Sequence, residues 1–379
     1  ILTVKYEVGL FDNPIGNSKD YPLFNSPEHN KLNYDMAADC ITLLKNNTSV
    51  LPLAKGTKIL VTGPTANSMR ALNGGWARNW QGTTSNETEK GKNTILEAIV
   101  NVFAKENVHS SDAVSFSTSA SDIADAVAKA KNADVVVLCI GEDSYTETPG
   151  NISDLTLSAS QIELAKALGA TGKPIVYVLA EGRPRVLSSI EPLATAVLQT
   201  YLLGNEGGNV VADVLAGKIN PSGKLPYTYP KHPNGLLNYY PKYTETLEFN
   251  EWSGYSPQWE FGFGLSYTTF KYNNLKLSSD KLSSDGGITV SVDVSNTGKL
   301  EGKETGVLFV SDEVASVTPE VKRLRGFEKI ALKPGETKNV SFKIDASLLS
   351  FITHDLSRVT EPGDFTLTIS DLKTRFKYQ

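Results

Sequence analysis

The sequence predicts an α/β sandwich, a mainly parallel sheet with helices on both faces, followed by an all-β sandwich. Apolar, β-branched runs at 59–63, 135–140 and 174–180 alternate with helix-like segments, which is typical of buried parallel strands. Beyond about residue 267 the pattern changes to alternating apolar and polar residues, with turn sequences between the segments. Several short strands of this kind indicate an antiparallel sandwich.

The first residues have the character of a helix end. Residues 1–11 carry no initiator methionine and lack the basic start and cleavage signature of a signal peptide. We therefore expect this chain to be the carboxyl-terminal part of something larger. A second helix should begin at Ser26 and Pro27, a capping residue followed by proline at the first helical position. Its apolar stripe is expected to extend through Leu43 and Leu44 to a break at 46–49.

The α/β unit is expected to continue with alternating strands and helices around a long Gly- and Trp-rich loop at 67–93. Ser121 is a candidate cap for one of the helices. The expected strands lie at 59–63, 113–117, 135–140, 174–180 and 195–202, and the expected helices at 95–103, 123–131, 158–168 and 209–216. Along the chain we expect a linker from a preceding domain at 1–36, the α/β domain at 37–230, a second linker at 231–266 and the β-sandwich at 267–379.

Composition argues against several classes of function. A net charge of -5 leaves no basic footprint, so nucleic acid is not an expected partner. No apolar run approaches the roughly 20 residues that span a bilayer. The histidines and the two cysteines show no metal-ligand spacing, and neither a dinucleotide fingerprint nor a phosphate-loop lysine is present. We therefore expect no metal and no cofactor, and Cys40 and Cys139 are expected to be free, buried thiols.

A loop rich in acids follows the strand expected at 135–140. It carries Glu142, Asp143 and Glu147 beyond the carboxyl end of the strand, where open α/β sheets commonly place ligand sites. One interpretation is that Glu147 or Glu142 is a general acid. The other is that these acids cap the following helix or only solvate the loop, as most surface carboxylates do. The local sequence leaves both open.

The loop at 73–82 places Trp76 and Trp80 among glycine and polar residues. Aromatic faces stack on the apolar C–H faces of sugars, while amides and carboxylates bind the hydroxyl groups. The alternative is a local hydrophobic cluster. Together with the acidic loop and the lack of a cofactor motif, the two tryptophans favour a carbohydrate ligand.

Short motifs along the whole chain resemble those of glycoside hydrolase family 3, a family of retaining, exo-acting β-glucosidases and glucan exohydrolases. They are YEVGLFDNP at 6–14, LLKN at 43–46, LPL at 51–53, GRP at 182–184, GNEGG at 204–208, NPSGKLP at 220–226 and FGFGLSY at 261–267. The resemblance implies that 1–36 is the exit from an amino-terminal (β/α)8 barrel and that the tail is a fibronectin type III-like domain. It also implies a β-glucoside or β-glucan substrate and the barrel of the same protein as a partner.

The resemblance further implies roles for individual residues. Glu147, in GEDSYTET at 141–148, is similar to the general acid/base of the plant glucan exohydrolases, and Trp80 to an aromatic platform for the sugar on the leaving-group side. Trp76 matches a neighbouring aromatic residue of the same motif. Because the position of the acid varies among subfamilies, Glu142 is the fallback. The family's nucleophile is a barrel aspartate, so Asp154 is expected to be structural.

Alternatives to a β-glucosidase are a member acting on β-xylosides or N-acetyl-β-glucosaminides, and a non-catalytic carbohydrate-binding module. Family habit implies an extracellular, periplasmic or lysosomal setting. In a secreted eukaryotic protein, Asn47, Asn86, Asn151 and Asn339 would be glycosylation acceptors.

Overall fold

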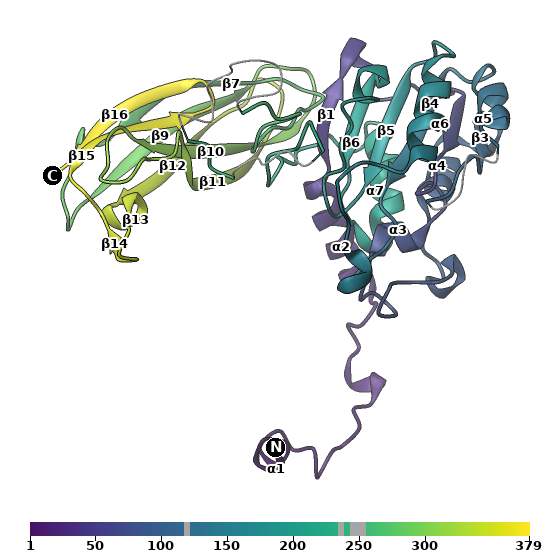
Figure 1. The fold of residues 1–379 in the computed structure, drawn as a ribbon, viewed down its shortest axis with the longest axis horizontal. Coiled ribbons are helices and arrows are strands. Elements are labelled where there is room, and N and C mark those ends of the chain that lie inside the picture. The colour runs from purple at the N-terminus through teal and green to yellow at the C-terminus, as the bar shows by residue number, and fades with distance from the viewer. Residues whose placement is uncertain (117–121, 234–238, 243–254) are drawn as a thin grey trace.

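The computed structural model describes residues 1–116, 122–233, 239–242 and 255–379, and it places an α/β domain beside a β-sandwich (Figure 1). The helices are α1 (Leu2–Glu7), α2 (Pro27–Cys40), α3 (Met69–Asn73), α4 (Ile95–Phe103), α5 (Ile123–Ala130), α6 (Ala159–Gly169) and α7 (Gly207–Leu215). The strands of the α/β domain are β1 (Thr42–Asn46), β2 (Ile59–Thr62), β3 (Val108–Ser111), β4 (Val135–Gly141), β5 (Ile175–Ala180) and β6 (Ala196–Gln199).

The α/β domain is built on one six-stranded sheet with the order β1-β6-β5-β4-β2-β3. All neighbouring strands pair in parallel except β1, which pairs antiparallel to β6. Every residue of β2, β4, β5 and β6 is buried, which explains why their sequences are apolar throughout and do not alternate. The predicted mainly parallel sheet is therefore confirmed.

Helices cover both faces of this sheet. On one face α2, α4 and α7 pack against side chains such as Val137 and Val178, and on the other α5 and α6 pack against Val136 and Tyr177. Helix α2 begins as the sequence predicts, because the Ser26 hydroxyl accepts a hydrogen bond from the backbone N–H of His29 at 3.2 Å. The two cores make the sheet a rigid platform for the loops at its ends.

Two expected elements differ from the structure. Leu43 and Leu44 belong to β1 and not to the preceding helix, which ends at Cys40. Pairing with β6 decides this, because it lets both side chains become buried on the sheet, a gain that the local sequence does not reveal. Residues 113–116 form no strand, since the edge strand is β3. Ser117 and the expected cap Ser121 lie outside the described residues.

The second domain is the predicted β-sandwich. Its strands are β7 (Phe270–Leu277), β8 (Lys281–Leu282), β9 (Gly287–Asn296), β10 (Gly302–Asp312), β11 (Arg323–Leu332), β12 (Thr337–Asp345), β13 (Phe351–Ile352), β14 (Arg358–Val359), β15 (Gly363–Ile369) and β16 (Leu372–Tyr378). One sheet has the order β11-β10-β15-β16-β8 and the other β12-β9-β7, with β13 and β14 forming a separate hairpin. The alternating residues of β9 and β12 bury their apolar side chains between the sheets.

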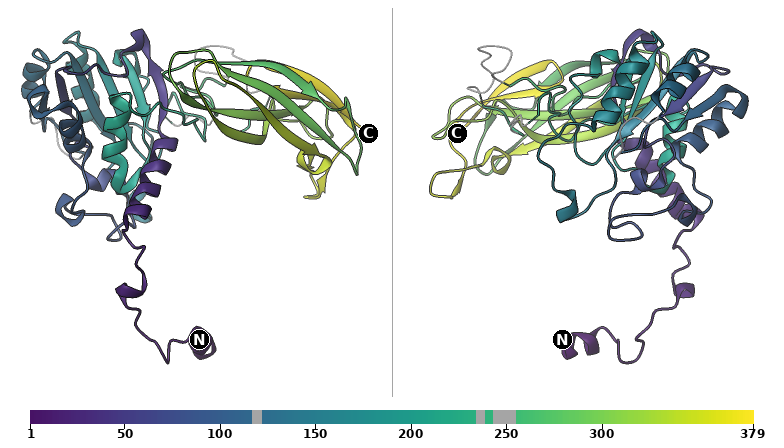
Figure 2. Two further views of the ribbon diagram at one scale, coloured as in Figure 1. Left: turned by 180° about the vertical axis from the view of Figure 1, so that it is seen from behind. Right: turned by 45° about the vertical axis from the view of Figure 1, so that its right-hand side comes forward.

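Charged contacts join the two domains at the edge next to β1. Lys303 lies 2.6 Å from the Asp39 carboxylate, and Lys329 donates to the Asp39 carbonyl at 2.9 Å. The amino-terminal segment with α1 extends away from both domains, as Figure 1 and Figure 2 show, and α1 buries none of its residues. No helix in the described parts of the chain has the length and apolar character needed to cross a membrane.

The two cysteines differ in their surroundings. Both are free, but Cys139 is buried in β4 whereas Cys40, expected to be buried as well, is exposed at the end of α2.

Candidate active site

The residues singled out in the sequence meet at one edge of the sheet. Because β2, β4, β5 and β6 are parallel, their carboxyl ends and the loops that follow them lie on the same side. The loop after β4, residues 142–158, is called the acid loop below. The loop after α3, residues 74–82, is called the tryptophan loop. The first carries Glu142 and Glu147 and the second carries Trp76 and Trp80.

Gly141 sets the direction in which the acid loop leaves the sheet. Its φ is +147°, and a Cβ at this position would lie 2.0 Å from the Ala180 carbonyl oxygen of the neighbouring strand. Only glycine fits this close approach of two backbones. The next residue, Glu142, still continues the sheet pattern, since its backbone N–H donates to the Ala180 carbonyl at 3.0 Å.

Glu142 is buried and fully engaged by arginine. Its Oε1 lies 2.8 Å from Nη2 of Arg183 and 2.9 Å from Nη2 of Arg185, and its Oε2 accepts the backbone N–H of Arg183 at 2.9 Å. The side chain is only 2% exposed. Both oxygens are therefore occupied by donors, and the pair holds the start of the acid loop against the loop after β5.

Tyr145 fixes the middle of the acid loop. Its ring lies under the Arg183 guanidinium, with the central carbon 3.6 Å from the ring centroid. Gly150 packs on the ring from within the same loop, where a Cβ would lie 2.6 Å from a ring carbon. Arg183 also donates to the Gly150 carbonyl, which closes the loop around the ring. Arg183 therefore ties the acid loop to the loop after β5.

Glu147 lies five positions beyond Glu142 in the acid loop and has the opposite surroundings. It is exposed, and among the residues that the structure describes none hydrogen-bonds to or ion-pairs with its carboxylate. Its backbone has φ +52°, an uncommon value for a residue with a side chain, and its carbonyl accepts the N–H of Gly150 at 2.8 Å. The loop thus presents a free carboxyl group at an ordered position.

The other acids near this loop have structural partners. Asp143 forms a forked pair with Arg70, at 2.7 Å to Nε and 3.4 Å to Nη2. Asp154 accepts the backbone N–H of Thr156 at 2.6 Å, a turn-stabilising contact that supports the structural role expected from the sequence.

The tryptophan loop exposes both of its indoles. Trp76 is 67% and Trp80 is 46% exposed, which is not the environment of a local hydrophobic cluster. The loop is closed by a hydrogen bond from the N–H of Trp76 to the carbonyl of Trp80 at 3.1 Å. Exposed aromatic faces on a fixed loop are available for stacking with a ligand.

Gln81 joins the two loops, and the sequence did not single it out. Its side-chain N–H donates to the Thr146 carbonyl at 3.0 Å, and its side-chain oxygen accepts the Thr146 N–H at 3.3 Å. The Ser144 hydroxyl donates to the Gln81 carbonyl at 2.9 Å. Gln81 follows Trp80 and Thr146 precedes Glu147, so this amide clamp fixes the aromatic loop beside the candidate acid.

Close packing supports this clamp. A Cβ at Gly75 would lie 2.6 Å from the Tyr145 carbonyl oxygen and 2.9 Å from Cβ of Thr146. In the sequence, this contact is indicated only by the glycine content of the tryptophan loop. Glycine permits another backbone to approach closely, but it does not identify which segment approaches.

A second buried acid lies beside the anchor of the acid loop. Glu181 follows β5, is completely buried, and accepts the Tyr229 hydroxyl at 2.8 Å and the Arg185 N–H at 3.3 Å through Oε1. Its Oε2 has no hydrogen-bond partner within the described part of the chain. Burial raises the pKa of Glu181 to about 8, although the Tyr229 hydrogen bond opposes the shift.

Proteins of known sequence resemble this chain over nearly all of its length. It is 38% identical to a lysosomal β-glucosidase of Dictyostelium discoideum, covering 98% of this chain and 47% of that protein. It is equally 38% identical to a periplasmic β-glucosidase of Salmonella typhimurium, covering 100% and 54%. A β-xylosidase of Formosa agariphila is 36% identical, covering 99% and 54%. The chain thus spans about half the length of the curated relatives it matches.

Solved structures agree with this. A β-glucosidase from Erythrobacter marinus superposes with a TM-score of 0.86 at 31% identity, covering 99% of this chain and 54% of that one. A β-glucosidase from Listeria innocua, in complex with isofagomine, has a TM-score of 0.84 at 30% identity, covering 100% and 54%.

Family models match both domains. Residues 304–372 match the fibronectin type III-like domain, and residues 41–267 match the C-terminal domain of glycosyl hydrolase family 3. The second match covers more than half of the chain and includes both loops of the candidate site. This chain therefore belongs to glycosyl hydrolase family 3.

Proposed function

We propose that this chain supplies the general acid/base, Glu147, and an aromatic platform, Trp80 with Trp76, to a retaining, exo-acting β-glucosidase. The observation that carries the proposal is the contrast between the loop backbones, which the Gln81 clamp bonds together, and the unbonded side chains that they carry. The clamp has the following result. It holds an unpaired, exposed carboxyl group beside two exposed indoles, on loops that are otherwise tightly bonded. The second carboxyl group that the reaction needs, an aspartate nucleophile, belongs to an amino-terminal (β/α)8 barrel.

In this mechanism the two carboxyl groups act on opposite sides of one bond. The barrel aspartate attacks the anomeric carbon while the Glu147 carboxylic acid donates its proton to the departing glycosidic oxygen. The glycosyl–aspartate ester is then hydrolysed by a water whose proton returns to Glu147, so the configuration at the anomeric carbon is retained. Glu147 has no competing hydrogen bond or ion pair among the described residues, so its carboxyl group is available to a substrate that reaches the acid loop.

Glu142, the fallback acid, is less suited to this role. Its two oxygens are already bound by Arg183 and Arg185, and its side chain is buried. A group that must give up and regain a proton at a sugar oxygen has to reach that oxygen. In our proposal Glu142 is the anchor of the acid loop.

The activities and locations of the relatives guide the choice of substrate and location. The two β-glucosidases at 38% identity favour a terminal β-D-glucosyl residue, and the β-xylosidase at 36% identity makes a β-xyloside the second candidate. Because those β-glucosidases are lysosomal and periplasmic, we place the protein outside the cytoplasm.

The experiment compares this chain alone with the protein that carries it behind its barrel. The chain alone should not hydrolyse 4-nitrophenyl β-D-glucoside, and the longer protein should, with the matching β-xyloside and N-acetyl-β-glucosaminide as competing substrates. A Glu147→Ala variant of the longer protein, given azide, should release the β-configured glucosyl azide, because azide needs no general base. Turnover by the chain alone would contradict the shared site. Azide rescue of Glu142→Ala in place of Glu147→Ala would move the acid to Glu142. Sugar binding with no turnover in the longer protein would instead indicate a binding module.

A further inference from the structure

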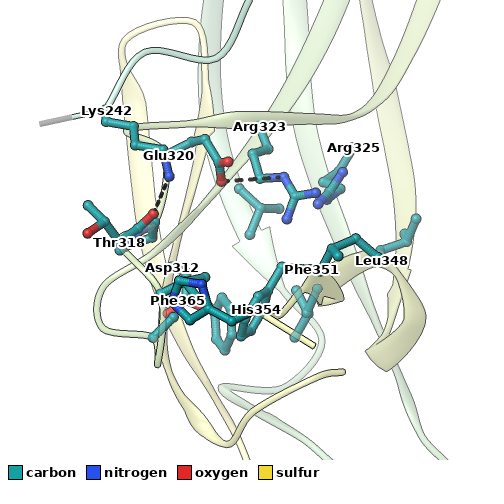
Figure 3. Close-up of a pocket in the computed structure, with 16 residues that line it drawn as sticks. Lys242, Asp312, Thr318, Glu320, Arg323, Arg325, Leu348, Phe351, His354 and Phe365 are labelled. Carbon is teal, nitrogen blue, oxygen red and sulfur yellow. Dashed lines mark hydrogen bonds and ion pairs between the residues drawn. The ribbon is translucent and has the colours of Figure 1, made fainter. Parts of the chain in front are cut away.

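A cavity of about 390 Å³ lies in the fibronectin type III-like domain, away from the loops of the candidate active site. It opens between β11, the β13–β14 hairpin and the turn that follows β10. Phe351 and Phe365 contribute apolar surface, and the polar groups include Asp312, Arg323 and Arg325 (Figure 3). A cavity of this size accommodates a monosaccharide or a small anion.

Two arginine side chains line one side of the cavity. Arg323 and Arg325 are two positions apart on β11, so they project from the same face of the strand, and Figure 3 shows them next to each other. Each makes few hydrogen bonds. Arg323 donates from Nη1 to the Ser350 carbonyl at 3.0 Å, and Arg325 from Nη1 to the Leu324 carbonyl at 3.3 Å. The buried Nε atoms of both have no hydrogen-bond acceptor in the described part of the chain.

The electrostatic surroundings of these arginines are unfavourable without an added negative charge. Burial, and then the like charge of Arg323, lower the pKa of Arg325, while Tyr240 and Glu320 oppose the shift. Arg358 itself donates to the Ser350 hydroxyl at 3.1 Å, beside the carbonyl that Arg323 uses. Two guanidinium groups, those of Arg323 and Arg358, therefore contact Ser350, and burying a guanidinium group without enough acceptors costs free energy.

The carboxylates near the cavity offset this charge only in part. The closest contact is between Oε2 of Glu320 and Nε of Arg323, at 3.8 Å, which is too long for a hydrogen bond. Asp312 is half-buried and accepts the backbone N–H of Val314 at 3.2 Å. Neither forms the two parallel hydrogen bonds that a guanidinium fork offers to an oxyanion.

We propose that this cavity binds a small oxyanion, a carboxylate or a phosphate, on the paired guanidinium groups of Arg323 and Arg325. The anion supplies a counter-charge to the two guanidinium groups. Two sources share this chemistry, inorganic phosphate and the carboxylate of an acidic sugar. The two ligands differ in the contacts they can make with the rest of the cavity. Only a sugar ring can place hydroxyl groups against Asp312 and C–H groups against Phe351. The inference is independent of the glycosidase function, since it concerns the other domain.

Isothermal titration calorimetry of the whole chain at low ionic strength tests the proposal, with inorganic phosphate, glucuronate and neutral glucose as the probes. We expect heat of binding from at least one of the two anions and none from glucose. Binding of phosphate alone would identify a phosphate site, and binding of glucuronate alone an acidic-sugar site. No binding of either anion at about 10 mM would overturn the proposal, because even two weak charge-assisted hydrogen bonds give millimolar affinity.

Substitutions locate the site. Arg325→Met keeps the apolar stem and removes the fork, and we expect it to weaken anion binding by about tenfold or more. Arg323→Lys keeps the charge but not the fork, and it should weaken binding as well. The matched control is Arg375→Met, which removes the same charge from an exposed position of β16 and should leave affinity unchanged. Equal losses in Arg375→Met and Arg325→Met would show general charge attraction and refute a defined site. Thermal melts confirm that each variant is folded.

Discussion

Glu142 and Glu147 leave the same strand five positions apart, yet the fold gives them opposite surroundings. Glu142 is buried, with Arg183 and Arg185 bound to its oxygens. Glu147 is exposed, and no residue in the described ranges binds its carboxylate. Glu142 anchors the start of the acid loop, and Glu147 is presented at its exposed tip.

The comparison teaches how a loop can be both rigid and reactive. Charge pairing, the stacking of Arg183 on Tyr145 and the Gln81 clamp restrain the loop backbone before Glu147, and the bond from Arg183 to the Gly150 carbonyl restrains it after Glu147. The restraining side chains are bonded to one another, so none of them binds the carboxyl group of Glu147. Four changes test this division of roles.

The largest expected effect is on catalysis at the tip. In the barrel-containing protein, Glu147→Gln should lower kcat for glucosides with poor leaving groups by about 10²- to 10⁴-fold, because it removes the proton donor. The bond-cleavage step with 2,4-dinitrophenyl β-D-glucoside should lose far less, since that leaving group needs no proton. Pre-steady-state release of the phenol measures this step. If the rate of bond cleavage fell equally for all leaving groups, Glu147 would not be the general acid.

The next effect is on stability at the anchor. Glu142→Gln should lower the free energy of unfolding of this chain by about 3 kcal/mol, because it leaves two partly buried guanidinium groups without their counter-charge. Asp143→Asn is the matched control, since the Asp143–Arg70 pair is much more exposed and should cost less than about 1 kcal/mol. Urea unfolding of the three proteins is the measurement. A Glu142→Gln variant as stable as Asp143→Asn would mean that the ion pairs do not anchor the loop.

The third effect is a pH dependence next to the anchor. The pKa of Glu181 rises from its ordinary value of 4.5 to about 8, so between these pH values the folded protein holds a proton that the unfolded chain has lost. Its contribution to stability is full below about pH 4.5, falls as the pH rises towards about 8, and then levels off. Glu181→Gln should flatten this fall, and exposed Glu163→Gln should not. Melting temperatures from pH 5 to pH 8 would detect it; parallel curves for wild type and Glu181→Gln would contradict it.

The smallest expected effect is at the clamp between the loops. Gln81→Ala removes two hydrogen bonds to Thr146, so kcat in the barrel-containing protein should fall by about tenfold for poor leaving groups. A positioning role predicts a smaller loss for the 2,4-dinitrophenyl glucoside, whereas a general structural defect would lower both equally. The control is Asn79→Ala, an exposed position in the same loop.

The sequence by itself determined the fold class and the kinds of side chain at the edge of the sheet. Continuous apolar runs predicted β2, β4 and β5, and alternation beyond about residue 267 predicted the β-sandwich. Strands buried on both faces have continuous apolar sequences, and strands buried on one face alternate. The position of the acids just after β4 then followed from parallel topology.

Only the tertiary structure decided which acid is held and which is free. The partners of Glu142 come from a different loop, 41 and 43 positions along the chain, and the partner of Thr146 is an amide 65 positions earlier. Leu43 and Leu44 show the same limit, since only pairing with β6 makes their segment a strand. Local sequence records the propensity and polarity of a residue. Its charge partners and its strand neighbours depend on long-range packing, and these set the environment of each carboxyl group.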